Sequence, residues 1–350
     1  MLSNILIIGP DQSKKGGVAT HINNITNYEA LKDAEIIDVG SRGTTLKSGR
    51  SSYWNIFKSL LSLRKIIKND RFHVLINASI YKSSFIKLLL ILLVIDEKHT
   101  KDLFVFFHGG RFDSKFEGLG RLSWLYTRIL NKPDKFFFLS EVQKKGFLKR
   151  IGDYPVSIYN NYSSSDEGLS RKEGEGIFTF LFVGRVVREK GIYELIEAVK
   201  LLQETGYNNF HLAIVGDGSN LREIKKKIKA NKLGEIISLY GFLGGDKLNR
   251  MYMESNWLVL PTYHEGFPYV FIESMRAGLP MITTRSGALT RLVTENVNGL
   301  FVEAKDVNSL YKKMKFVLDE KLNLSDNCYS FFSKNLSKSA GESFYKDLIS

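Results

Sequence analysis

Short apolar runs alternate with segments of helical period in both halves of this chain, and the alternation restricts the folds open to it. Residues 178–183 (FTFLFV) read as a buried strand, and apolar residues follow at helical spacing from 192 to 202. The first half opens in the same way, with a strand at 5–8 and a helix after it. This pattern predicts an α/β fold with a doubly wound parallel sheet in each half. The further predicted strands are 74–77, 103–107, 136–139, 210–215, 237–240, 257–260 and 280–283.

A polar stretch rich in glycine and serine, NNYSSSDEGLSRKEGEG at 160–176, separates the two halves. A chain of 350 residues suits two domains. We expect a first domain at 1–163, a linker at 164–176, a second domain at 177–335 and a closing helix at 336–350. Two such domains that face each other would form an interdomain cleft lined by the carboxyl ends of both sheets.

Positive charge is concentrated in the first half. The net charge is +13, and residues 1–163 hold 25 Lys and Arg against 14 Asp and Glu. Such an excess favours an anionic partner, either a nucleic acid or an acidic membrane surface. No nucleic-acid-binding motif is present, so no nucleic acid is predicted as a partner. The segment 53–68, with 82–95, mixes aromatic, aliphatic and basic residues and could rest on anionic lipid; the alternative is an ordinary amphipathic helix against the sheet.

Other features concern the compartment of the protein. The single cysteine, Cys328, excludes a disulfide framework. The first residues lack the pattern of a signal peptide. The apolar run 88–95 (LLLILLVI) is too short to span a bilayer and predicts a buried helix. We therefore expect a cytoplasmic protein, with peripheral placement on the inner face of the cell membrane as an option.

The loop between the first strand and its helix contains Lys14, Lys15, Gly16 and Gly17. Glycines there would let the backbone approach a phosphate at a helix N-terminus, although a plain strand-to-helix turn explains them equally well. The loop does not match G-x-G-x-x-G, which disfavours a nicotinamide dinucleotide site.

Cations follow one of the predicted strands, and a histidine follows another. Arg185 and Lys190 follow the strand at 178–183 and could hold a diphosphate, with Arg188 between them; the alternative is a solvated loop of a basic protein. His108 ends the strand at 103–107 and is either a site residue or a structural histidine. The six histidines fit no common ligand spacing, so no metal site is predicted.

Two glutamates bracket a Gly-Phe-Pro turn in HEGFPYVFIES at 264–274. Glu265 falls in the loop after the strand at 257–260, and Pro268 suits the start of a helix. Glu273 then lies about one and a half turns into that helix, so the two carboxylates are not on one helix face.

These motifs together resemble the retaining, nucleotide-sugar-dependent glycosyltransferases of family 4, also called glycosyl transferases group 1, which have the GT-B fold of two facing Rossmann-like domains. The resemblance covers nearly the whole chain. It rests on GGVATH at 16–21, FHGG at 107–110, LSEVQK at 139–144, FVGR with KG within 182–191, VGDG at 215–218 and EGFPYVFIE at 265–273.

The resemblance implies a role for each site residue. Gly16 and Gly17 would approach the donor phosphates, and Arg185 and Lys190 would hold the diphosphate. The remaining implied contacts are Phe242 with the nucleobase, Glu265 with the sugar together with the N–H groups of Gly266 and Phe267, Glu273 with the ribose, and His108 with the sugar and acceptor.

The reaction implied is transfer of a sugar from a UDP- or GDP-sugar to a hydroxyl of a glycan or lipid-linked acceptor. Fixed cations would stabilise the leaving diphosphate, so no metal and no cofactor are expected. Surface polysaccharide synthesis, such as capsule or lipopolysaccharide, is the implied setting. The alternatives are a catalytically silent nucleotide-sugar-binding protein and an epimerase of the same fold. One departure is Arg291, which stands where relatives often carry an acid.

Overall fold

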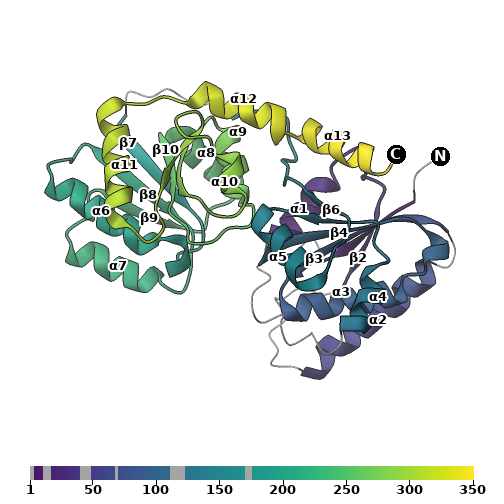
Figure 1. Ribbon diagram of the computed structural model, residues 1–350. Coiled ribbons are helices and arrows are strands. Elements are labelled where there is room, and N and C mark those ends of the chain that lie inside the picture. Colours follow the sequence, from purple (N-terminus) through teal and green to yellow (C-terminus); the bar gives the residue numbers. More distant parts are fainter. Residues whose placement is uncertain (1–3, 11–16, 40–48, 68–69, 111–122, 170–175) are drawn as a thin grey trace. The chain divides into compact units, whose positions relative to one another are not determined.

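The computed structural model describes residues 4–10, 17–39, 49–67, 70–110, 123–169 and 176–350. The chain divides into two compact units (Figure 1). The first is Met1–Ser165 together with Lys338–Ser350, and the second is Asp166–Ser337. The chain therefore returns to its first unit for its last helix. The sequence analysis placed a linker at 164–176 and a second domain at 177–335, whereas the second unit runs from Asp166 to Ser337.

The first unit is built on a parallel sheet of six strands in the order β2-β1-β3-β4-β5-β6. Its strands are β1 (Ile5–Gly9), β2 (Glu35–Asp38), β3 (Phe72–Ile80), β4 (Thr100–Gly110), β5 (Lys135–Phe138) and β6 (Val156–Ile158). Its helices are α1 (Gly17–Ile25), α2 (Gly49–Ile67), α3 (Lys82–Val94), the short η1 (Glu97–His99), α4 (Ser123–Leu130), α5 (Glu141–Ile151) and α13 (Lys338–Leu348).

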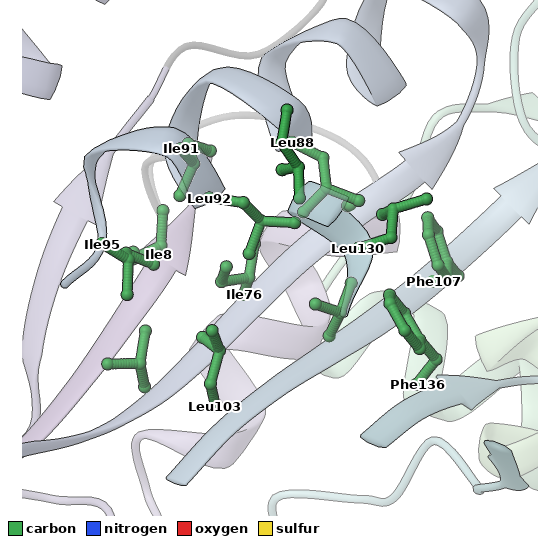
Figure 2. Close-up of a cluster of buried hydrophobic side chains, with 14 of the residues drawn as sticks. Ile8, Ile76, Leu88, Ile91, Leu92, Ile95, Leu103, Phe107, Leu130 and Phe136 are labelled. Carbon is green, nitrogen blue, oxygen red and sulfur yellow. The ribbon is translucent and has the colours of Figure 1, made fainter. Parts of the chain in front are cut away.

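Helices cover both faces of this sheet. Neighbouring residues of a strand point to opposite faces, so their contacts show which helices lie on each face. Phe107 belongs to a cluster with buried residues of α2, α3, α4 and α5. Figure 2 shows Leu88, Ile91 and Leu92 of α3 directed at the strands in this cluster. Phe106, one residue earlier, contacts His21 of α1 and Tyr345 of α13. The helices α1 and α13 therefore cover the other face.

The second unit has its own parallel sheet of six strands, in the order β12-β11-β10-β7-β8-β9. Its strands are β7 (Phe178–Val183), β8 (Phe210–Val215), β9 (Ile237–Gly241), β10 (Trp257–Leu260), β11 (Met281–Thr284) and β12 (Gly299–Val302). Its helices are η3 (Arg188–Lys190), α6 (Ile192–Glu204), α7 (Leu221–Ala230), α8 (Asp246–Glu254), α9 (Tyr269–Arg276), α10 (Leu289–Leu292), α11 (Val307–Glu320) and α12 (Ser325–Asn335).

The predicted strands are all present, and those at 178–183, 210–215 and 257–260 have the predicted bounds. Three strands were missed, β2, β6 and β12, because each has only three or four residues and too short an apolar run to signal a strand. Helix α12 was also missed.

The prediction of a buried helix at 88–95 was wrong in part. Helix α3 buries Leu88, Ile91 and Leu92, but Leu90 and Leu93 of the same run are 39% and 56% exposed. The reason is that the helix lies on the outside of the sheet, where only one of its faces meets the core.

Helix α13 is anchored by a fully buried tyrosine, Tyr345, whose hydroxyl is hydrogen-bonded to Nε2 of His21 over 3.1 Å and whose ring contacts Phe106. We predict that Tyr345→Ala lowers the free energy of unfolding by about 3–5 kcal/mol, because it leaves a cavity and a buried imidazole that has lost a partner. Urea unfolding of the full chain measures the loss, with hydrogen exchange in β4 reporting on the first unit. The exposed Lys346→Ala in the same helix should change stability by less than about 0.5 kcal/mol; equal effects would contradict the anchoring role.

Candidate functional site

The strand order of the second sheet determines where a ligand would bind. Chain connections run from β7 through β8 to β9 on one side and from β10 through β11 to β12 on the other. The order therefore reverses between β7 and β10, which are hydrogen-bonded neighbours. In open parallel sheets, ligands bind outside the carboxyl ends of the strands at such a reversal. The loop with Arg185 and Lys190 follows β7, and the loop with Glu265 follows β10, so both lie at this point.

The two loops are joined by an ion pair between Lys190 Nζ and Glu265 Oε1. The side chains are only 16% and 10% exposed, so solvent screens their attraction less than on an open surface. The pair spans the reversal of strand order and brings together two residues that lie 75 positions apart in the sequence. The sequence had placed each residue in a loop but gave no sign that they touch.

Two glycines let these loops pack backbone against backbone. A Cβ added to Gly191 would lie 2.1 Å from the carbonyl oxygen of Pro261, and one added to Gly287 would lie 1.8 Å from that of Glu265. Both residues have positive φ, +71° and +56°, which glycine adopts without strain. Glycine is therefore required at both places, one on each side of the loop that carries Glu265.

Hydrogen bonds fix the same loop. The backbone N–H of Glu265 donates to Oγ of Ser286 over 2.9 Å, and that of Tyr263 donates to the carbonyl oxygen of Glu189 over 2.9 Å. The hydroxyl of Tyr263 donates to Glu194 over 2.7 Å, and burial raises the pKa of this tyrosine to about 12. The loop after β10 is thus tied to the segments that follow β7 and β11, which holds Glu265 in a fixed position.

The peptide between Gly266 and Phe267 is oriented by helix α10. The carbonyl oxygen of Gly266 accepts a hydrogen bond from Ala288 N over 2.8 Å. Because a trans peptide is planar, the N–H of Phe267 points the opposite way, away from Ala288. Arg291 of the same helix lies over the Phe267 ring, with its guanidinium carbon 5.8 Å from the ring centroid. The arginine at the usually acidic position therefore packs against the candidate sugar loop.

Glu273 is held by a residue that the sequence analysis missed. The hydroxyl of the fully buried Tyr252, on α8, donates to Oε2 of Glu273 over 2.6 Å. Burial raises the pKa of Glu273, while the hydrogen bond from Tyr252 and the charge of Arg276 lower it. Tyr252 therefore fixes one carboxylate oxygen of Glu273. No motif marks this tyrosine; only its position between Met251 and Met253 on an amphipathic helix could have suggested that it is buried.

Three further residues follow carboxyl ends of strands in the second sheet. Arg185 is exposed in the loop directly after β7. The neighbouring Arg188 lies over the Tyr193 ring at 4.2 Å, which gives it a separate structural contact and leaves Arg185 and Lys190 as the candidate cations. Phe242 follows β9 at the carboxyl edge of the sheet and is 72% exposed.

In the first unit, His108 lies in a buried polar cluster. Its Nε2 lies 2.8 Å from Oδ1 of Asn77, and its Nδ1 lies 2.9 Å from the hydroxyl of Tyr159. The His21 ring lies 4.4 Å away. Burial lowers the pKa of His108 well below its usual value, and His21 lowers it further. The neutral ring can donate to Asn77 and accept from Tyr159, so both nitrogens are used within the unit, and a role of His108 beside the sugar and acceptor stays a prediction.

Burial lowers the pKa of His21 itself to about 3. Two imidazoles in contact are thus both kept neutral by burial, which avoids repulsion between them.

Gly17 is the exposed first residue of α1, with open space where a Cβ would lie. Gly16 lies outside the described residues.

Comparisons with known proteins show what this chain is similar to. Residues 169–331 match the family model of the glycosyl transferases group 1. These residues belong to that family. The match contains every strand of the second sheet together with Arg185, Lys190, Glu265 and Glu273.

Two relatives in sequence extend the comparison beyond these residues. An uncharacterized glycosyltransferase of Methanocaldococcus jannaschii is 30% identical over 214 residues, which cover 60% of this chain and 58% of that protein. This match spans less than two thirds of the relative. An uncharacterized 41.2 kDa protein of the cps region of Klebsiella pneumoniae is 24% identical over 326 residues, covering 87% of each chain.

The solved structure of Anabaena HepE in complex with UDP-glucose superposes with a TM-score of 0.76 at 12% identity and covers 99% of each chain. At this identity the likeness establishes the fold. With its two parallel sheets of six strands, the chain has the GT-B fold of glycosyltransferases.

The glycine pattern of the family site leads to a prediction about Gly287. Gly287→Ala should lower the free energy of unfolding by about 2–4 kcal/mol, because the new methyl group overlaps the Glu265 carbonyl and φ is positive. Thermal unfolding measures the difference. The matched control is Gly206→Ala, where φ is +95° but no atom lies within 4 Å, so about 1 kcal/mol is expected. An equal cost for the two variants would contradict the close packing at Gly287.

Proposed function

We propose that this protein is a retaining, metal-independent glycosyltransferase that moves a sugar from a nucleoside-diphosphate sugar to a hydroxyl of a glycan or lipid-linked acceptor. The observation that carries the proposal is the Lys190–Glu265 ion pair at the reversal of strand order, beside the exposed Arg185. This arrangement places cations that can bind a diphosphate next to a carboxylate that can bind sugar hydroxyls. Both lie within residues 169–331, which match the family model.

The donor would bind along the carboxyl edge of the second sheet. Arg185 and Lys190 hold the diphosphate, and the exposed ring of Phe242 stacks on the nucleobase. Glu273, already fixed through one oxygen by Tyr252, accepts hydrogen bonds from the ribose. Glu265 and the N–H groups of Gly266 and Phe267 contact the sugar. Gly16 and Gly17 would approach the phosphates from the first unit, and His108 would serve the acceptor.

Binding of the donor exchanges one charge partner for another. Without donor, Lys190 pairs with Glu265. When the diphosphate arrives, Lys190 turns to it, and Glu265 becomes available to accept hydrogen bonds from sugar hydroxyls. The ion pair therefore keeps both charged groups paired in a shielded place until their substrate partners replace them, which avoids leaving either charge buried and alone.

The transfer itself breaks the bond between the anomeric carbon and the diphosphate oxygen and forms a bond from that carbon to the acceptor oxygen on the same face. The acceptor proton passes to the departing diphosphate. Negative charge builds on the phosphate as the bond breaks, and Arg185 and Lys190, once paired with the diphosphate, would stabilise the transition state. These cations would do the work that a divalent ion does elsewhere, and activity should survive EDTA.

The biological setting belongs to the same proposal. The relative from Klebsiella comes from a cps region, which supports a place in surface polysaccharide synthesis. The HepE complex makes UDP-glucose a sensible first donor to test. A lipid-linked acceptor would require the enzyme to work at the surface of a membrane.

A donor screen tests the site. We predict that at least one UDP-, GDP- or ADP-sugar raises the thermal midpoint of the native protein. Arg185→Ala and Glu273→Ala should weaken that donor about tenfold to a hundredfold, because each removes a charge-assisted hydrogen bond. Lys226→Ala, which removes an exposed cation of α7, should bind as the native protein does. Absence of stabilisation by every donor, or equal loss in the control, would refute the site.

Products then distinguish the enzyme classes. Transfer of the sugar to an acceptor supports the proposal. An altered sugar recovered from the donor alone would make the protein an epimerase, and binding without any turnover would make it a silent binding protein. Either result would overturn the proposed reaction while leaving the donor site in place.

The exchange of charge partners predicts that one variant binds a nucleoside diphosphate more tightly but transfers sugar more slowly. Glu265→Gln keeps the size of the side chain but frees Lys190 from its ion pair, so a nucleoside diphosphate without sugar should bind about fivefold more tightly. Sugar transfer by this variant should fall about a hundredfold, because the carboxylate that contacts the sugar is lost. Isothermal titration and initial rates measure the two effects. Lys190→Met should weaken the diphosphate instead; weaker diphosphate binding by Glu265→Gln would contradict the exchange.

A further inference from the structure

Helix α3 carries apolar residues on two sides. Leu88, Ile91 and Leu92 are buried against the sheet (Figure 2). Ile86, Leu90 and Leu93 face solvent and are 45%, 39% and 56% exposed. Their spacing of four and three residues aligns them in one stripe along the helix. An apolar stripe that faces water is costly unless another surface covers it.

Helix α2 packs beside α3 and also carries exposed apolar side chains (Figure 1). Its Phe57 and Leu61, one turn apart, are 49% and 52% exposed. The two helices also share a groove of about 560 Å³ near their carboxyl ends, lined by Arg64 of α2 and Leu93 of α3 among others. The α2–α3 surface consists of the five exposed apolar residues Phe57, Leu61, Ile86, Leu90 and Leu93.

This concentration is unusual within the described parts of the chain. The other exposed large apolar side chains are spread over many elements, apart from Tyr81 directly before α3. They are Val142, Ile177, Tyr240, Phe242, Val297, Phe316 and Tyr329. Single exposed apolar residues are normal on soluble proteins, whereas a contiguous group marks a surface of interaction.

Charge indicates what covers the α2–α3 surface. The sequences of α2 and α3 contain six Lys and Arg residues and no Asp or Glu. Lys58, Arg64 and Lys65 are exposed beside the apolar stripe. A second copy of the chain would bring the same positive surface against this one and be repelled, whereas anionic lipid headgroups would attract it. Apolar side chains inside a rim of cations match the boundary between headgroups and acyl chains.

We propose that the α2–α3 surface binds the face of an anionic lipid bilayer, with its five apolar side chains in the headgroup boundary and Lys58, Arg64 and Lys65 on the lipid phosphates. Within the described residues, no helix is long and apolar enough to cross a membrane. The two helices therefore lie along the surface. Such binding would bring the first unit to a lipid-linked acceptor.

The test uses the full chain and vesicles of phosphatidylcholine with or without phosphatidylglycerol. Sedimentation should recover the native protein with the mixed vesicles at low salt, with less bound at high salt and less to pure phosphatidylcholine. The double variant Leu90→Ser with Leu93→Ser should lower partitioning roughly tenfold, because two side chains lose their burial in lipid. The control is Phe316→Ser, which removes an equally exposed apolar residue of α11 in the second unit and should bind as native.

Two measurements keep the outcome clear. Circular dichroism and donor-induced thermal shift should be unchanged in the double variant, which shows that it is folded and separates this proposal from that of the donor site. No binding to the mixed vesicles at low salt, or equal binding by native protein and a folded double variant, would overturn the proposal. The proposal would also be overturned if the native protein were a dimer in sedimentation velocity and the double variant a monomer, because the surface would then bind a second copy of the chain.

Discussion

The ion pair between Lys190 and Glu265 is the contact around which the candidate site is organised. It lies where the strand order of the second sheet reverses, so it joins the two loops that a ligand at this edge must touch. Each charge is largely shielded from water, and each neutralises the other. The site can therefore hold a cation and a carboxylate ready without the cost of an unpaired buried charge.

Backbone packing makes this arrangement rigid. Gly191 and Gly287 each approach a carbonyl oxygen so closely that no other residue fits, and Ser286 binds the N–H of Glu265. Tyr252 fixes Glu273 from a different helix. The charged groups are thus held by neutral neighbours whose own positions depend on the sheet. Such support is what keeps a site in one geometry when its ligand arrives.

In the first unit, buried polar side chains are neutral and bind one another, unlike the charged pair of the candidate site. His108 and His21 are in ring contact, both are kept neutral by burial, and Tyr159 and Tyr345 bond to them from distant parts of the chain. The cluster ties β4, α1 and the returning α13 together. Its outer helices behave differently again, since α3 packs one apolar face on the sheet and leaves another exposed. The first unit therefore combines a buried polar cluster with an exposed apolar helix face.

The sequence by itself determined the fold class, most strands and the loops that hold Arg185, Lys190 and Glu265, because strand and helix periods and turn residues are local signals. Short strands such as β2 and β12 carried too little local signal. The strand order, the pairing of Lys190 with Glu265, the support of Glu273 by Tyr252 and the exposed face of α3 were decided only by the tertiary structure. They depend on which distant segments become neighbours, and no periodicity within one segment contains that information.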